Sequence, residues 1–148
     1  MGPQRRVAGI RRITPGLQGA KLFFASHPLR ARVGAVVNME ARGGGGRTVL
    51  FQTSSQNGAA ARLYAATVAH PGASSLAIFV YSVLPNDTDL TPVLKGPYTG
   101  YNFAFIGRPG LYHSPLATPE RLDQGSLQDM GGQVLALTRA LLVAPQLP

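Results

Sequence analysis

The sequence predicts a single α/β domain, a three-layer αβα sandwich in which helices cover both faces of a mostly parallel sheet. Short β-branched apolar runs alternate along the chain with segments whose apolar residues recur at helical spacing. The length of 148 residues and the hydrophobic content of 45% suit one core. The chain contains no cysteine, which excludes disulfides and thiolate metal ligands.

Residues 1–15 form a basic segment with two Arg pairs and no clear periodicity, which we expect to be a disordered or non-native leader. The net charge of +8 lies entirely in residues 1–47, which carry nine Lys or Arg and one Glu, because residues 48–148 carry five charges of each sign. The basic region lacks the interleaved aromatic residues and the recognition helix of nucleic-acid-binding modules. We therefore expect no nucleic-acid partner.

The domain proper is predicted over residues 16–144 and opens with a helix over residues 17–26, which a following proline ends. Residues 33–39 form an apolar, β-branched run, the pattern of a strand that is covered on both faces. The glycines at positions 43–46 predict a flexible turn, and residues 48–51 predict a second strand.

Residues 56–69 are rich in alanine and predict a second helix. Residues 74–84 fit a helix better than an alternating strand, and residues 85–89 form a polar loop. Residues 102–106 predict the third strand. The inner face of a last helix is marked by five apolar residues, Leu127, Met130, Val134, Leu137 and Leu141. This helix ends abruptly, and residues 145–148 remain as a tail.

Two side chains that can bind a metal stand where predicted strands give way to loops. Glu40 ends the first strand, and His113 lies a few residues past the third. Because ligands of α/β sheets gather at the carboxyl ends of the strands, this placement suits a shared site. A carboxylate and an imidazole are half of a zinc site. The alternatives are that Glu40 is a surface carboxylate paired with Arg42 or Arg47 and that His113 is simply solvated.

Five short motifs follow one another along the chain. They are Gly16-Leu17-Gln18-Gly19, Asn38-Met39-Glu40-Ala41-Arg42-Gly43, Pro85-Asn86-Asp87-Thr88-Asp89, Asn102-Phe103-Ala104-Phe105 and Tyr112-His113-Ser114. With them the chain, over residues 16–143, resembles the C-terminal half of the catalytic domain of the co-catalytic di-zinc exopeptidases. That family includes aminopeptidase Y and the endoplasmic reticulum metallopeptidases. The resemblance implies a partial zinc-exopeptidase domain whose complete form hydrolyses peptides with two zinc ions.

The resemblance also implies roles for single residues. Glu40 matches a ligand of one zinc ion, and His113 matches a ligand of the other. Tyr112 matches a tyrosine that in some relatives donates a hydrogen bond to the reacting carbonyl oxygen, a catalytic role. Asp89 matches an acidic residue with a supporting role. Relatives commonly face away from the cytosol on membrane-anchored chains, which implies an extracytoplasmic or membrane-associated location.

Several of the family's functional residues are missing from this sequence. In the family a bridging aspartate, a second histidine, the catalytic glutamate and a further glutamate ligand all precede the position of Gly16. The adjacent Glu-Glu pair falls here on Ile13 and Thr14, and residues 1–15 contain no acidic residue and no histidine. Ala117 stands where an aspartate usually follows the histidine by four residues. We therefore expect a truncated site that is inactive alone.

Two explanations of this pattern stay open, a truncated or frame-shifted reading frame and a degenerate paralogue. The first functional hypothesis is a zinc-dependent, aminopeptidase-like domain. The alternative is a non-catalytic interaction module that keeps the peptidase fold and self-associates or binds a partner through an exposed sheet edge. No apolar run in the sequence approaches the roughly 18 residues that a membrane span needs.

Overall fold

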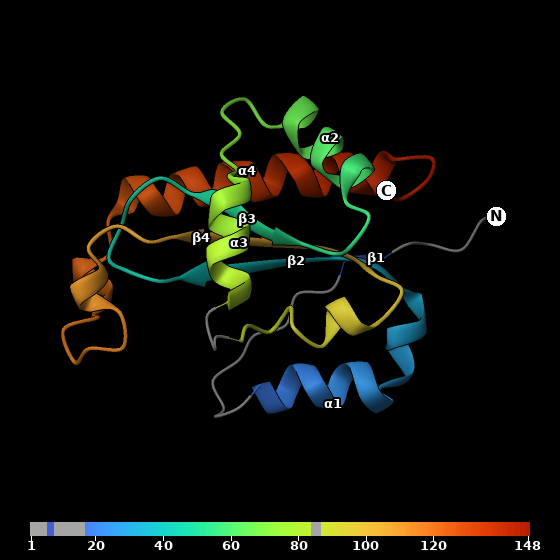
Figure 1. Cartoon of the computed structure of the whole chain (residues 1–148), viewed down its shortest axis with the longest axis horizontal. Coiled ribbons are helices and arrows are strands. Elements are labelled where there is room, and N and C mark those ends of the chain that lie inside the picture. The colour runs from blue at the N-terminus through green and yellow to red at the C-terminus, as the bar shows by residue number, and fades with distance from the viewer. Residues whose placement is uncertain (1–5, 8–16, 84–86) are drawn as a thin grey trace.

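The computed structural model describes residues 6–7, 17–83 and 87–148. Its helices and longer strands follow the order predicted from the sequence, and one further short strand precedes them (Figure 1). In chain order the elements are β1 (Arg6–Val7), α1 (Gln18–Ser26), β2 (Val33–Ala41), β3 (Val49–Thr53), α2 (Gly58–Thr67), α3 (Ser75–Val83), β4 (Thr99–Phe105) and α4 (Gln124–Val143). Apart from β1, the predicted leader over residues 1–15 lies outside the described residues.

The strands form one sheet in the order β1-β2-β4-β3. Strand β2 runs parallel to both β1 and β4, whereas β3 pairs with β4 in the antiparallel direction. The α/β class is therefore confirmed, and the sheet is mixed. The connection between β2 and β3 comprises only the seven residues 42–48, which explains the reversal, because a parallel crossover needs about a dozen residues or more.

One face of the sheet carries the main core. Tyr101, Phe103 and Phe105 alternate along β4, and all three rings are buried against α2 and α4. Figure 1 shows these two helices together on one side of the sheet, with α1 on the other side. Burying a large apolar side chain contributes about 1.5–3 kcal/mol, so this face supplies much of the driving force for folding.

The opposite face of the sheet carries two smaller clusters. Val36 packs with Leu90 and Val93, and α1 adds Phe24 to this group. Ala104 packs with Phe51 and Tyr81, which brings α3 onto the same face. The division follows from the two-residue period of a strand, because Ala104 lies between two residues that point into the main core.

A buried polar network ties α4 to α2 and to the segment that leads into β3. The Thr48 backbone N–H donates to Asp129 Oδ2 at 2.9 Å, and the Tyr64 hydroxyl donates to Gln133 Oε1 at 2.6 Å. Burial raises the pKa of Tyr64, so its hydroxyl keeps its proton and remains a donor at neutral pH. The network holds α4 in one rotation relative to the sheet.

Residues 145–148, the predicted tail, turn back toward the sheet. Helix α4 ends at Val143, Leu147 packs against the main core, and the Thr99 hydroxyl donates a hydrogen bond to the Pro148 carbonyl oxygen. The segment is therefore part of the packed structure and covers the start of β4.

The glycine run at residues 43–46 is packed closely, which differs from the flexible turn predicted for it. The Gly45 N–H donates to the Gly107 carbonyl at 3.2 Å, and the two residues form an antiparallel bridge. A Cβ atom added to Gly43 would overlap the Gly107 carbonyl oxygen. The absence of side chains thus serves a close approach of two backbone segments.

Replacing Gly43 tests this close approach. We expect Gly43→Ala to lower the free energy of unfolding by about 1–3 kcal/mol, because its methyl group would press against the backbone at Gly107. Gly131→Ala is the matched control, since nothing lies within 4 Å of a Cβ at this position in α4. The control should be neutral or stabilising by up to about 1 kcal/mol. Urea unfolding followed by circular dichroism measures both, and equal effects would contradict the packing argument.

Candidate functional site

The three residues predicted for the site lie around one cavity of about 490 Å³. Glu40 reaches it from the end of β2, and Tyr112 and His113 reach it from the loop that follows β4. Because β2 and β4 are parallel neighbours, their carboxyl ends meet at this edge of the sheet. Much of the remaining cavity wall is formed by seven residues, Gly43, Gly44, Ala117, Thr118, Pro119, Arg121 and Leu122.

Glu40 is half-buried and held by a neighbour on its own strand. The Asn38 side-chain amide donates to Glu40 Oε1 at 3.0 Å. Among residues 17–83 and 87–148 the one ion pair joins Arg108 and Asp123, so Glu40 is not paired with Arg42 or Arg47. The alternative of a surface ion pair does not describe this carboxylate.

Arg42 lies among aromatic rings. Its guanidinium carbon lies 4.9 Å from the centroid of the Tyr81 ring, 5.6 Å from that of Phe51 and 5.9 Å from that of Tyr112. Its Nη2 also donates to the Tyr81 hydroxyl at 3.4 Å. The negative faces of the rings attract the cation, which links the Tyr112 loop to α3 and β3.

The Tyr112–His113 pair sits on a tight, turn-rich loop. The two rings are stacked with their centroids 3.9 Å apart and their planes at 20°. His113 has a positive φ of 54°, in the left-handed region, which costs of order 1 kcal/mol for a residue other than glycine. The Ser114 N–H closes the turn on the Leu111 carbonyl at 3.2 Å. Both rings are exposed, so a ligand in the cavity can reach them.

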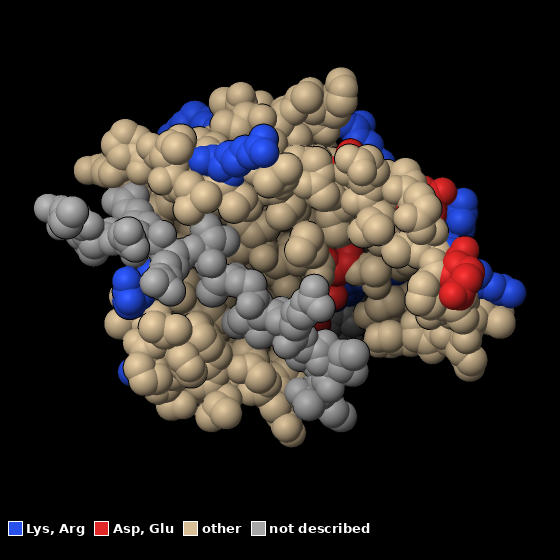
Figure 2. Space-filling model, turned by 180° about the vertical axis from the view of Figure 1, so that it is seen from behind, with Lys and Arg blue, Asp and Glu red and all other residues tan. Residues whose placement is uncertain are grey.

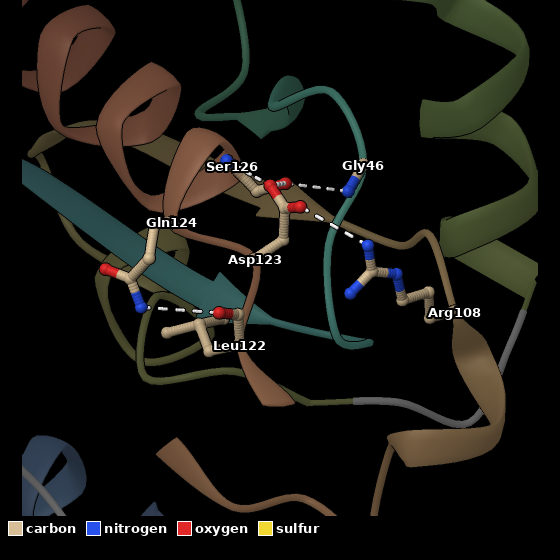
Figure 3. A network of polar contacts seen from close by, with 6 residues as sticks. All are labelled: Gly46, Arg108, Leu122, Asp123, Gln124 and Ser126. Atoms are coloured by element: carbon tan, nitrogen blue, oxygen red, sulfur yellow. Dashed lines mark hydrogen bonds and ion pairs between the residues drawn. The ribbon is translucent and has the colours of Figure 1, made fainter. Parts of the chain in front are cut away.

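The C-terminal end of this loop is held at the start of α4 by hydrogen bonds and an ion pair (Figure 3). Asp123 caps the helix, since its Oδ1 accepts from the Ser126 N–H at 2.8 Å and from the Ser126 hydroxyl at 2.9 Å. Arg108 lies 3.3 Å from Asp123 Oδ2, and the Ser126 hydroxyl accepts from the Gly46 N–H at 2.8 Å. The Asp123 N–H donates to the Gly44 carbonyl at 2.9 Å. Loop, helix and glycine run therefore form one connected unit.

Asp89 takes a different place from the other predicted residues. It is half-buried and is not among the residues that line the cavity. Its Oδ1 is buried and, within the described part of the chain, has no hydrogen-bond partner. Residues 85 and 86 of the same predicted loop lie outside the described residues. A supporting role for Asp89 stays a prediction.

Sequence reasoning missed three amide side chains beside the site. Asn38 in β2, Asn102 in β4 and Gln52 in β3 are joined by hydrogen bonds across the sheet. The available signal was one amide side chain within each of three largely apolar strands. A buried polar group needs a partner, so three such residues indicate that they satisfy one another.

The face opposite to that of Figure 1 carries scattered Lys and Arg side chains (Figure 2). Near the middle of this face, atoms of acidic residues lie in a hollow.

The donor types at the cavity suit zinc, but their number does not complete a site. A catalytic zinc ion takes three protein ligands and a water molecule. Within residues 17–83 and 87–148 no group of three or more His, Cys, Asp or Glu is placed to hold a metal ion. Glu40 and His113 therefore offer two donors. Ala117 lies in the cavity wall, and its side chain has no polar atom that could orient His113.

Comparison with known proteins identifies a family and several relatives. The family model described as peptidase family M28 matches residues 14–138. Endoplasmic reticulum metallopeptidase 1 of Homo sapiens and that of Rattus norvegicus are each 32% identical over 134 residues, which cover 88% of this chain and 15% of the relative. The vacuolar membrane protease of Lachancea thermotolerans is 32% identical over 118 residues, which cover 78% of this chain and 12% of the relative.

The chain thus spans about 15% of the length of the curated relatives that it matches most extensively. No solved structure matches it.

The helix cap at the end of the site loop should make stability depend on pH. Hydrogen bonds from Ser126 lower the pKa of Asp123, so the stabilisation by its carboxylate is present above the unfolded pKa of about 3.9 and is lost as the pH falls through the lower folded value. We expect Asp123→Asn to lower the urea midpoint at pH 7, and the difference from the wild type to shrink progressively as the pH falls below about 3.9. A difference that stays constant across this range would contradict the contribution of the charge.

Proposed function

The chain belongs to peptidase family M28, and we propose that it forms part of the catalytic domain of a zinc-dependent exopeptidase of the aminopeptidase type. The observation that carries this proposal is the meeting of Glu40, Tyr112 and His113 at one cavity. The substrates proposed for the complete domain are peptides. A three-layer αβα sandwich is part of the proposal, supported by α2 and α4 on one face and by α1 and α3 on the other.

Each cavity residue has a proposed task. Glu40 and His113 would each bind one ion of a two-zinc centre, because carboxylate and imidazole are the donors that catalytic zinc sites use. When bound, such a pair of ions polarises the scissile carbonyl and supplies a hydroxide. The Tyr112 hydroxyl would donate to the carbonyl oxygen as negative charge develops on it. The stack on His113 and the nearby Arg42 support a fixed direction for the Tyr112 ring.

We further propose that the chain alone has little or no peptidase activity. Among the described residues, Glu40 and His113 are the two carboxylate or imidazole donors that line the cavity, and residues 1–15 contain no acidic residue and no histidine. Ile13 and Thr14, at the positions of the family's Glu-Glu pair, lie outside the described residues and have no side chain that could serve as a general base. Loss of general-base catalysis alone costs about 10²- to 10⁴-fold in rate.

Zinc titration tests the two proposed ligands. We expect the chain to bind Zn²⁺ weakly in calorimetry, and Glu40→Ala and His113→Ala each to weaken binding at least as much as the roughly 10–100-fold that loss of an outer-shell partner costs. His70→Ala is the matched control, because His70 is an exposed histidine away from the cavity. Equal losses in all three variants would mean non-specific binding to histidine and acidic side chains.

A peptidase assay of the same proteins tests the proposed inactivity of the chain and the proposed roles of Glu40 and His113. The wild-type chain should release no product from an aminoacyl chromogenic substrate above the blank. If the wild-type chain instead proves active, aminopeptidase activity that is retained in Glu40→Ala and His113→Ala would show that these residues do not belong to the catalytic site.

The location of the protein is also a proposal. The relatives are named as endoplasmic reticulum metallopeptidases and vacuolar membrane proteases, which supports an extracytoplasmic or membrane-associated location. Within the described residues no helix combines the length and the hydrophobicity that crossing a membrane requires.

A second candidate function, a non-catalytic interaction module, is favoured by the outer face of α3. The nine residues of this helix carry no charge, and Tyr81 is its buried residue. Leu76, Phe79 and Val83 are each more than 60% exposed, and their spacing places them in one stripe. Helix α3 lies against β3, the strand at the end of the sheet, so this stripe and the sheet edge could together bind a second copy of the chain.

Replacing the centre of the stripe tests self-association. We expect the wild-type chain to form dimers or larger species at micromolar concentration, and Phe79→Ser to shift it toward the monomer because the exposed apolar contact is lost. Val143→Ser is the control, since Val143 is 81% exposed at the end of α4, on a different element. Size-exclusion chromatography with light scattering measures the mass. A wild-type chain that remains monomeric at all concentrations would exclude the interaction through α3.

A further inference from the structure

Three amide side chains form a continuous line of hydrogen bonds across three strands and end at the Glu40 carboxylate. Asn102 Nδ2 donates to Gln52 Oε1 at 3.0 Å, and Asn102 Oδ1 accepts from Asn38 Nδ2 at 2.8 Å. Asn38 Nδ2 also donates to Glu40 Oε1 at 3.0 Å. The sheet register pairs Asn102 with Asn38 on one side and with Gln52 on the other. We call these three amides the amide relay.

The charge of Glu40 sets the direction of every hydrogen bond in the amide relay. An ionised carboxylate only accepts, so Asn38 must turn its NH₂ group toward Glu40. The same NH₂ group then meets Asn102, which must present its oxygen and direct its own NH₂ group the other way. Asn102 Nδ2 therefore donates to Gln52 Oε1 and to the Thr88 hydroxyl oxygen, the latter at 2.8 Å.

Burial gives the amide relay its rigidity. Asn102 has no exposed surface, and Thr88 is 1% exposed. A buried donor that loses its partner costs free energy, so Asn102 cannot rotate without breaking several bonds at once. Asn102 holds Asn38 by a hydrogen bond, and Asn38 in turn holds one carboxylate oxygen of Glu40. The other carboxylate oxygen of Glu40 has no hydrogen-bond partner within the described residues.

We infer that Asn38 and Asn102 are positioning residues that, together with Gln52, fix the orientation of the Glu40 carboxylate at the cavity. One oxygen is occupied by Asn38, which leaves the second for a ligand. Neither Asn38 nor Asn102 lines the cavity, so they act through Glu40. Only the nature of that ligand, a divalent metal ion, rests on the proposed function; the orientation of Glu40 does not.

A swap of charge and amide tests the amide relay without any metal. Asn38→Asp sets two carboxylates within hydrogen-bond distance, and their repulsion should lower the urea midpoint. Adding Glu40→Gln supplies an amide opposite the new carboxylate, and each bond of the relay can then reverse. The double variant should therefore regain a large part of the lost midpoint. A double variant whose loss equals the sum of the two single losses would overturn the inference.

A second comparison tests positioning directly, with Zn²⁺ as the probe. Asn102→Leu and Gln133→Leu each remove a buried amide, but Gln133 belongs to the network on the other face of the sheet. Both variants should be less stable than the wild type. Only Asn102→Leu should weaken Zn²⁺ binding in calorimetry, by about 10–100-fold, because an outer partner orients a ligand.

The outcomes separate this inference from the proposed function. Equal Zn²⁺ affinities in the folded Asn102→Leu and Gln133→Leu variants would refute the positioning role. If no variant and not even the wild type binds Zn²⁺, the proposed metal ligands are wrong, and the charge swap at Asn38 and Glu40 still decides whether the amide relay orients the carboxylate.

Discussion

The parallel pairing of β2 with β4 is the constraint on which the rest of the structure depends. Its register runs without a shift from Ala35 opposite Thr99 to Ala41 opposite Phe105. It therefore ends both strands at one edge, where Glu40 from β2 and the loop after β4 form the cavity. The same register sets Asn38 beside Asn102, since the hydrogen bond between them requires directly opposed residues. A slip of one residue would turn Glu40 to the other face of the sheet.

Close contacts between backbone segments stabilise the sheet edge at the carboxyl ends of β2 and β4. The glycine run at residues 43–46 lies against Gly107, and the start of α4 is joined to it through Asp123 and Ser126. These contacts leave little room for side chains, which is why glycines occupy the crossing. The loop that carries His113 is consequently held at both ends, although its rings are exposed. Hydrogen bonds between backbone segments thus hold much of the cavity wall in place.

The two proposed metal ligands, Glu40 and His113, are supported unequally by their surroundings. The Glu40 carboxylate is supported by the amide relay, yet the wall near His113 has the methyl group of Ala117, which can orient nothing. One donor is therefore well supported and the other is held mainly by its backbone turn and by the Tyr112 ring. The exposed apolar stripe of α3 adds a surface on which a contact with a second chain is physically reasonable.

The sequence by itself determined the order of the elements, the α/β class and the residues that meet at the cavity. Periodicity places the helices and strands, and the rule for the carboxyl ends of strands brings Glu40 and His113 together. The resemblance to the exopeptidase motifs predicted that Tyr112 belongs to the same site. Tertiary structure alone decided the close packing of the glycine run, the aromatic surroundings of Arg42 and the amide relay. All three depend on contacts between segments far apart in the chain, because a hydrogen bond or a ring contact requires atoms to meet within a few ångströms, and local patterns carry no information on that distance.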